Sequence, residues 1–147
     1  MQIRHATIDD MPALLDMGEK FYATTHYAAT KPYCRETVAG LVKLMLDGVL
    51  LIAERDGLPV GMVGLVVVPW LFNASLLTAT EVVWWVDPEA QKAGIGKALL
   101  EAIEPACRER GASTIVMMHL AESPPAAAIL YQRYGYRWTE MSFAKEL

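Results

Sequence analysis

Gly94 and Gly96 stand between an apolar, strand-like segment (residues 82–86) and a segment with helical spacing of apolar residues, where a backbone loop can bind an anion. The first N–H groups of a helix have no partner inside it, and the helix dipole adds positive charge at that end. Glycine has no Cβ, so a phosphate group can come close to the backbone there. The pattern therefore indicates a phosphate-binding loop, with Lys92 and Lys97 adding positive charge at its rim.

Two other glycine-rich phosphate loops do not fit this segment. A P-loop requires a glycine five positions before Gly96, where Gln91 stands, and a serine or threonine where Ala98 stands. A dinucleotide fingerprint that starts at Gly94 requires a third glycine where Leu99 stands. A tight turn between strand and helix, with no ligand, stays open as the alternative.

The same segment resembles motif A of the GCN5-related N-acetyltransferases (GNAT), whose pattern is Gln/Arg-x-x-Gly-x-Gly/Ala. Gln91, Gly94 and Gly96 occupy its three fixed positions, and residues 128–136 resemble the family's motif B. The expected order of elements fits the family over essentially the whole chain. The resemblance implies that the loop's backbone amides bind the pyrophosphate of acetyl-CoA.

The resemblance also implies which residues contact acetyl-CoA. Trp85 and Val86 would pair with the pantetheine arm through their backbones. Ser123 stands near the position where the family often has an asparagine, so its hydroxyl would have to replace that contact. The full set lies in the strand end, the loop and the last helix with its approach: Trp85, Val86, Gln91, Lys92, Ala93, Gly94, Ile95, Gly96, Lys97, Ser123, Ala128 and Tyr131.

Amine acetylation requires a neutral amine and a proton for the departing thiolate. A lysine-like amine with a pKa of about 10.4 must be deprotonated at a cost of about 4.6 kcal/mol at pH 7, so a general base helps. Tyr131 stands where the family has its thiolate-protonating tyrosine, although a tyrosine there could also only pack on the core. Glu81, beside an apolar strand, is the first candidate for the base, with a solvent-facing carboxylate as the alternative. His119 is the second candidate.

Length and composition limit the class of protein. The 147 residues suit one domain, 1–147, and 54% hydrophobic with 20% charged residues describe a globular chain. A net charge of -4 argues against a nucleic-acid partner. The apolar stretch 60–72 is too short to span a membrane. Cys34 and Cys107 form no metal-like pair, so we expect no metal site, reduced thiols and a cytoplasmic enzyme.

Hydrophobic periodicity predicts an α/β (α+β) domain, in which a mixed central sheet of about six to seven strands is flanked by about four helices. Residues 69–77 are expected to be irregular, Pro105 to kink or shorten its helix, and Ser123 to cap the last helix. The expected strands are residues 3–6, 50–54, 60–68, 80–86, 114–118, 136–140 and 142–145.

The acceptor is expected to be a small-molecule or peptide amine, bound near residues 21–35 and 69–77. A longer acyl group than acetyl would require more depth near Trp84 and Trp85. The competing class is a non-catalytic acyl-CoA-binding sensor or scaffold of the same fold. Exposed strand edges and the apolar residues 66–77 are compatible with a homodimer.

Overall fold

Five strands form a single sheet in the order β1-β2-β3-β4-β5 in this computed structural model, which describes all 147 residues. The first four strands are antiparallel neighbours, and β5 is parallel to β4. No helix has both the length and the apolar character needed to cross a membrane. In chain order, the strands and α-helices are β1 (Gln2–His5), α1 (Met11–Ala23), α2 (Arg35–Asp47), β2 (Val49–Arg55), β3 (Leu58–Trp70), β4 (Asn73–Val86), α3 (Ile95–Glu109), β5 (Ala112–Val116) and α4 (Pro125–Arg133).

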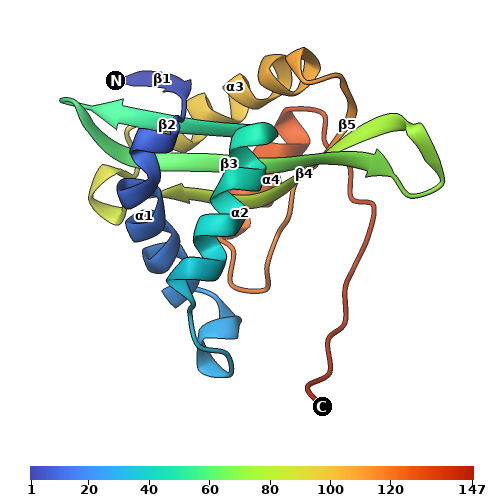
Figure 1. Cartoon of the computed structure of the whole chain (residues 1–147), viewed down its shortest axis with the longest axis horizontal. Helices are drawn as coiled ribbons and strands as arrows, with labels where there is room; N and C mark the ends of the chain where they lie inside the picture. The colour runs from blue at the N-terminus through green and yellow to red at the C-terminus, as the bar shows by residue number, and fades with distance from the viewer.

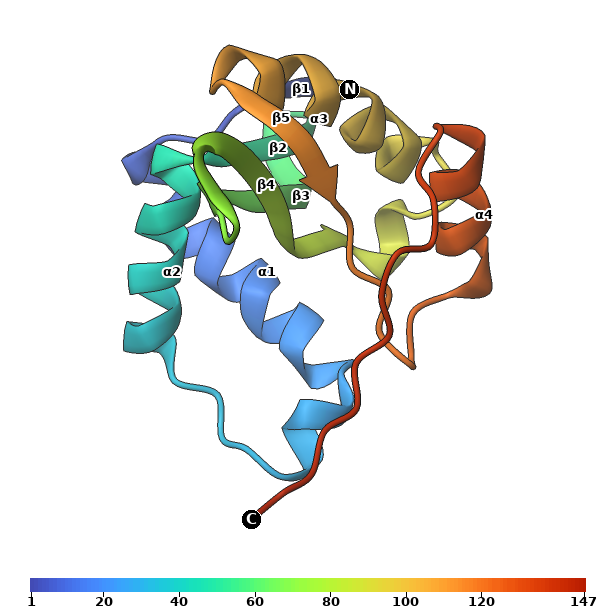
Figure 2. The same ribbon diagram turned by 90° about the vertical axis from the view of Figure 1, so that its right-hand side faces the viewer.

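Helices cover both faces of the sheet, and each face has its own apolar core (Figures 1 and 2). α1 and α2 bury their apolar sides on one face, whereas α3 and Tyr131 of α4 pack on the other. Because successive side chains of a strand point to opposite faces, neighbouring residues of β4 belong to different cores. Trp84 packs on the α3 side and Trp85 on the α1 side, where its ring lies 6.3 Å from that of Phe21.

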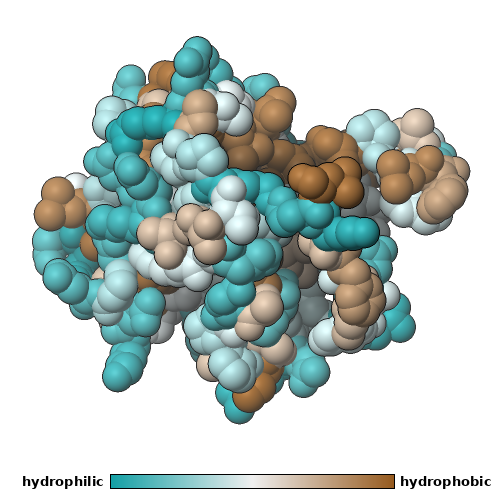
Figure 3. All heavy atoms as spheres, turned by 90° about the horizontal axis from the view of Figure 1, so that it is seen from below, coloured by the Kyte–Doolittle hydropathy of each residue, from teal (hydrophilic) through white to brown (hydrophobic).

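The hairpin of β3 and β4 is longer than the sequence suggested. Residues 69–77, expected to be irregular, continue the two strands up to the pair formed by Trp70 and Asn73. β2 pairs with β3 only as far as Leu65, so the end of the hairpin projects beyond the sheet as a lobe with apolar side chains (Figure 3). Leu71 and Phe72 at its tip are 91% and 84% exposed. Apolar residues that face solvent break the alternation from which a strand is predicted.

The expected sixth and seventh strands are absent, so the prediction of six to seven strands was wrong. Residues 136–140 and 142–145 have no strand partner, although their composition favours β structure. The Tyr136 N–H donates to Tyr131 O, which sets the direction in which the chain leaves α4. From there the C-terminal segment, residues 137–147, runs exposed along one side of the molecule (Figure 2). Composition favours a strand, but a strand also needs a neighbouring edge.

The structure contradicts the expected shortening of α3 and the expected cap of α4. α3 is not shortened at Pro105 but continues to Glu109, because residues on both sides of the proline are buried on the core face. Ser123 does not cap α4, which begins at Pro125 after Pro124. Instead the Ser123 hydroxyl accepts a hydrogen bond from the Leu120 N–H at 2.9 Å and closes the turn before the helix.

Gly48 ends α2 where the chain turns into β2, and we expect Gly48→Ala to lower stability by about 1–3 kcal/mol. A Cβ at Gly48 would lie 2.5 Å from the backbone oxygen of Leu65, a group that cannot rotate away. Gly40→Ala is the matched control, because Gly40 lies inside α2 with nothing within 4 Å of its added Cβ. It should raise stability by about 0.5–1 kcal/mol. Urea unfolding measures both, and an unchanged midpoint for Gly48→Ala would show that β3 moves aside.

Candidate functional site

A groove of about 510 Å³ opens where the ends of α1 and β4 meet the beginnings of α3 and α4. Among the predicted cofactor-binding residues, Ala93, Ala128 and Tyr131 do not line it. α4 contributes Ala126, Ala127 and Leu130 instead. The predicted residues that do line it are Trp85, Val86, Gln91, Lys92, Gly94, Ile95, Gly96, Lys97 and Ser123. The structure therefore brings most of the predicted set together around one space.

The loop before α3 presents a run of free backbone donors to this groove. None of the N–H groups of residues 92–97 has a backbone acceptor, and the first bond of the helix is from Ala98 N–H to Gly94 O. Lys92 and Gly94 adopt left-handed backbone angles, with φ of 68° and 77°. The Gln91 side chain donates from Nε2 to Val86 O at 3.2 Å and so ties the loop to the end of β4. Free N–H groups at a helix N-terminus suit a phosphate.

The surroundings of the two glycines show what each glycine contributes to the turn and to the space above it. The positive φ at position 94 favours glycine there. Position 96 has no positive φ, so its backbone angles do not call for glycine. A Cβ at Gly96 would meet Trp84 at 3.5 Å, an ordinary contact, so packing does not exclude a side chain there. The Trp84 indole N–H beneath the loop is buried without an acceptor. Glycine at 96 therefore leaves room above the loop. With this room and the free N–H groups of residues 92–97, the loop fits the pyrophosphate of acetyl-CoA.

β4 and β5 separate beside this loop. Their parallel pairing ends at Thr80 and Val116, so the following residues of β4 have no strand partner on that side. Glu81 is the first residue of β4 after the separation, and Met118 follows β5 across the gap. The Met118 N–H donates to the Glu81 carboxylate at 2.7 Å. The free edge of β4 leads from this contact to Trp85 and Val86 in the groove, which is where an extended ligand could pair with the backbone.

Glu81 and Tyr131 are held by the same residue. Glu81 is 6% exposed, and burial raises its pKa to about 7, opposed by the Met118 N–H. The Tyr131 hydroxyl donates to Met118 O at 3.1 Å. Burial raises the pKa of Tyr131 and the nearby negative charge of Glu81 raises it further, so its hydroxyl stays protonated. Met118 had no signal in the sequence, because it acts only through its backbone.

The second candidate base lies elsewhere. His119 is exposed, and its Nε2 lies 3.4 Å from Pro124 O in the turn before α4. No hydrogen bond connects its ring to Glu81. The structure thus brings Glu81 and Tyr131 together through Met118 and leaves His119 outside that arrangement.

Only one of the two expected acceptor regions reaches the groove. Phe21, Thr24 and Thr25 at the end of α1 line it, whereas residues 69–77 form the projecting hairpin tip. Next to these residues, His26 Nδ1 lies 3.0 Å from the Glu122 carboxylate, a contact that joins the α1–α2 connection to the β5–α4 connection. Of the two regions expected to bind the acceptor, the groove is therefore bounded by the end of α1 and not by the hairpin.

The cysteines form no disulfide: Cys34 is exposed and Cys107 is buried, both as free thiols. Burial raises the pKa of Cys107 to about 11, which keeps it a thiol at neutral pH. Cys107 packs in the core on the α3 side. A thiol that stays protonated is a poor nucleophile, so Cys107 is poorly suited to form a covalent acetyl intermediate.

Comparison with known proteins agrees with this geometry. Residues 14–136 match the acetyltransferase (GNAT) family, and the chain belongs to that family. An uncharacterized N-acetyltransferase of Methanocaldococcus jannaschii is 29% identical over 142 residues, which cover 95% of this chain and 62% of that protein. A mycothiol acetyltransferase of Salinispora arenicola is 44% identical over 55 residues, which cover 37% of this chain and 18% of that protein. The chain spans less than two thirds of either relative.

Solved structures share the fold at low sequence identity. The ribosomal-protein-alanine N-acetyltransferase from Brucella melitensis biovar Abortus 2308 has a TM-score of 0.75 at 18% identity, with all of both chains covered. A predicted acetyltransferase from Clostridium acetobutylicum, solved with acetyl-CoA, has a TM-score of 0.75 at 16% identity, with 99% of this chain and 95% of that chain covered. At these identities the likeness establishes the fold alone.

Proposed function

We propose that this protein transfers the acetyl group of acetyl-CoA to a primary amine by direct attack while both substrates are bound. The observation that carries the proposal is the position of buried Glu81 and Tyr131, both held by Met118, where the free edge of β4 leads to the loop of unpaired N–H groups. Membership of the GNAT family and the Clostridium acetobutylicum structure with acetyl-CoA support the choice of acetyl donor.

Acetyl-CoA, when bound, supplies an activated thioester. The N–H groups of residues 92–97 hold its pyrophosphate, and the backbones of Trp85 and Val86 hold its extended arm. Glu81 accepts the proton that the amine loses as its nitrogen bonds to the acetyl carbon. Tyr131 donates its hydroxyl proton to the sulfur as the carbon–sulfur bond breaks, so that the products are an amide and a neutral thiol.

The acceptor is a primary amine that reaches Glu81 from the α1 side of the groove. Phe21, Thr24 and Thr25 offer an aromatic ring and two hydroxyls there, which suits a mainly apolar pocket with a few polar contacts. A peptide with N-terminal alanine belongs in the first screen, because a ribosomal-protein-alanine N-acetyltransferase shares the fold. The two free thiols fit a cytoplasmic location, which is part of the proposal.

Isothermal titration with acetyl-CoA and with CoA tests the cofactor site, and we expect micromolar dissociation constants. Gly94→Trp should weaken binding at least about ten-fold, because a bulky side chain at the loop covers the N–H groups that bind pyrophosphate. Gly57→Trp is the matched control: Gly57 has a φ of 76°, like the 77° of Gly94, and open space around it, but it lies in the β2–β3 turn. Equal loss in both variants would mean that strain, and not a blocked site, explains it.

Thiol release in the presence of amines then tests turnover. A panel of small primary amines and a peptide that begins with alanine would be supplied with acetyl-CoA. Acetyl-CoA binding without acetylation of any amine would favour the sensor or scaffold of the same fold. Absence of acetyl-CoA binding at millimolar concentration would overturn the proposed function.

A further inference from the structure

The groove carries opposite charges on its two sides. On the side of the loop before α3, Lys92, Lys97 and the free N–H groups suit a phosphate. On the α1 side, Glu122 in the connection between β5 and α4 is the only acidic side chain that lines the groove. The pyrophosphate of the donor belongs on the first side, so the charge of Glu122 has no part in binding it.

The end of α1 adds to this negative charge. α1 ends at Ala23, and Thr24 and Thr25 after it line the groove. A helix dipole puts partial negative charge at the C-terminus, where a cation is favoured. The Thr24 hydroxyl donates to Phe21 O at 2.7 Å, and the Thr25 hydroxyl donates to Tyr22 O at 2.8 Å. Because each hydroxyl has used its only proton, both offer a ligand nothing but lone pairs.

His26 fixes the position of Glu122. Its Nδ1 lies 3.0 Å from the Glu122 carboxylate, and because a carboxylate only accepts hydrogen bonds, the imidazole nitrogen is the donor. This hydrogen bond lowers the pKa of Glu122, which keeps the carboxylate ionised. An ionised carboxylate accepts about four hydrogen bonds, so the contact with His26 leaves capacity for the N–H groups of a ligand.

Glu122 lies within reach of the place where the amine reacts. Met118, whose N–H donates to Glu81 at 2.7 Å, precedes Glu122 by four residues. Four residues span at most about 14 Å when fully extended, and the turn closed by the bond from Ser123 N–H to Leu120 O shortens this span. A short flexible molecule can therefore reach from Glu81 to Glu122.

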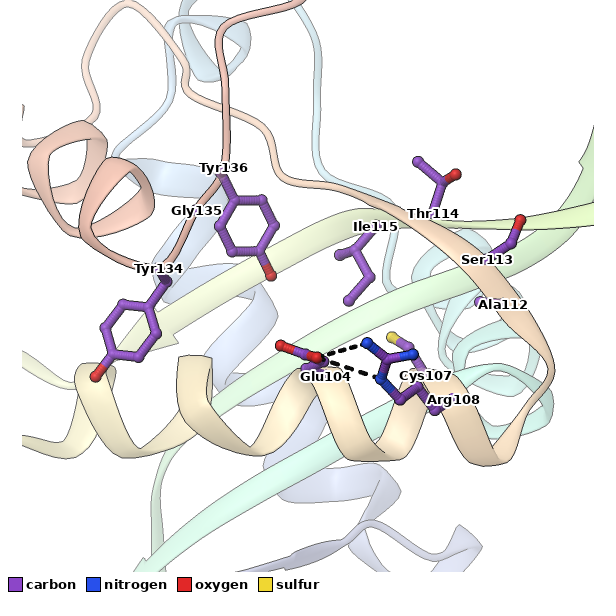
Figure 4. A pocket seen from close by; sticks show the side chains of 10 residues that line it. All are labelled: Glu104, Cys107, Arg108, Ala112, Ser113, Thr114, Ile115, Tyr134, Gly135 and Tyr136. Atoms are coloured by element: carbon purple, nitrogen blue, oxygen red, sulfur yellow. Dashed lines mark hydrogen bonds and ion pairs between the residues drawn. The ribbon is translucent and has the colours of Figure 1, made fainter.

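A smaller cavity of about 210 Å³, between α3, β5 and the end of α4, lacks this feature (Figure 4). Its one carboxylate, Glu104, pairs with Arg108 at 2.8 Å, so the cavity offers a ligand no uncompensated charge. No lysine or arginine forms an ion pair with Glu122. The acidic charge on the α1 side of the groove is thus available to a cation.

We infer that the acceptor is a small dication, in which one amine is acetylated at Glu81 while a second ammonium or guanidinium group pairs with Glu122 beside the C-terminus of α1. This inference rests on the proposed function and names its substrate class. The second cation keeps its protons and takes no part in the acetyl transfer. The rings of Phe21 and Trp85, 6.3 Å apart, line the same groove and offer apolar contact to the chain that joins the two groups.

Three amines with the same alkyl chain test the inference at pH 8, where histidine side chains are largely uncharged. Cadaverine has an ammonium group at both ends, pentylamine has only one, and ε-aminocaproate ends in a carboxylate. We expect kcat/KM for cadaverine to exceed that for pentylamine about ten-fold, well above the statistical factor of about two for equivalent ends. The value for ε-aminocaproate should be the lowest. Equal values for cadaverine and pentylamine, apart from that statistical factor, would overturn the inference and leave acetyl transfer to amines standing.

Variants at Glu122 test which residue binds the second cation. Glu122→Gln should lower the ratio of the cadaverine value to the pentylamine value about ten-fold, and Glu122→Lys should reverse the preference toward ε-aminocaproate. Glu89→Gln is the matched control, because Glu89 is an exposed carboxylate near the loop before α3 that does not line the groove. It should leave the ratio unchanged. A preference for cadaverine that survives Glu122→Gln, or falls equally in Glu89→Gln, would contradict the inference.

Binding measured without turnover separates this inference from the proposed function. Calorimetric titration of the CoA-saturated protein with cadaverine and with pentylamine requires no acetyl transfer. Tighter binding of cadaverine that is lost in Glu122→Gln would support a dication site even if no amine were acetylated, an outcome that would overturn the proposed function alone. Equal binding of the two amines would overturn the inference, whether or not either amine is acetylated.

Discussion

Replacing Tyr131 by phenylalanine is expected to lower kcat about 100- to 1,000-fold, with little change in the KM for acetyl-CoA. The substitution removes only the hydroxyl, so the ring contacts with Trp84 and Tyr136, at 5.3 Å and 5.8 Å between centroids, remain. Because burial and the charge of Glu81 raise the pKa of Tyr131, the wild-type hydroxyl holds its proton until a thiolate forms. The measurement is thiol release with an amine found in the screen.

The hydroxyl also has a structural contact, the bond to Met118 O, so a stability control is required. Tyr134→Phe removes a hydroxyl from the same helix end, where it donates to Glu101 on the surface. Tyr134→Phe should keep full activity. Wild-type turnover in Tyr131→Phe, with unchanged acetyl-CoA binding, would show that Tyr131 is a packing residue and that another group protonates the thiolate.

Replacing Glu81 by glutamine is expected to remove the inflection near pH 7 from the pH profile of kcat/KM. Since burial raises the pKa of Glu81 to about 7, the fraction of carboxylate, and with it the wild-type rate, rises as pH increases through 7. The variant has no base at this position, so its rate at pH 8 should be about 100-fold lower, and its profile should rise only with the neutral fraction of the amine. Glu109→Gln, an exposed carboxylate at the end of α3, is the control and should leave the profile unchanged.

The same substitution is also expected to change how the free energy of unfolding depends on pH, which can be measured without knowing the acceptor. A carboxyl whose folded pKa of about 7 lies above its ordinary 4.5 keeps its proton longer in the folded chain. The free energy of unfolding therefore falls as pH rises from 4.5 to 7, by about 3 kcal/mol, and stays constant above. Glutamine cannot ionise, so thermal unfolding of Glu81→Gln should lack this decrease. A parallel pH dependence of both melting temperatures would show that Glu81 is not buried as a titrating group.

The sequence was sufficient to predict the position of the glycine-containing loop before α3, because the residues that define it are close together in the chain. Gln91, Gly94 and Gly96 lie within six residues, and the spacing alone puts their backbone at a helix N-terminus. The periodicity of the helices was also readable, since each buries one face over three or four turns. The hairpin tip and the C-terminal segment were misjudged. In both, apolar residues are exposed, and composition does not reveal whether a strand has a neighbour.

The relation between Glu81 and Tyr131 was decided only by the tertiary structure. The two residues lie on different elements, far apart in the chain, and they meet through the two backbone groups of Met118 after β5. A backbone contact leaves no mark on residue type, so no spacing predicts it. The raised pKa of Glu81 likewise depends on burial between the diverging strands and not on its sequence neighbours. The sequence determined which groups are present and where the glycine-containing loop lies, and packing determined that Glu81 and Tyr131 meet at Met118.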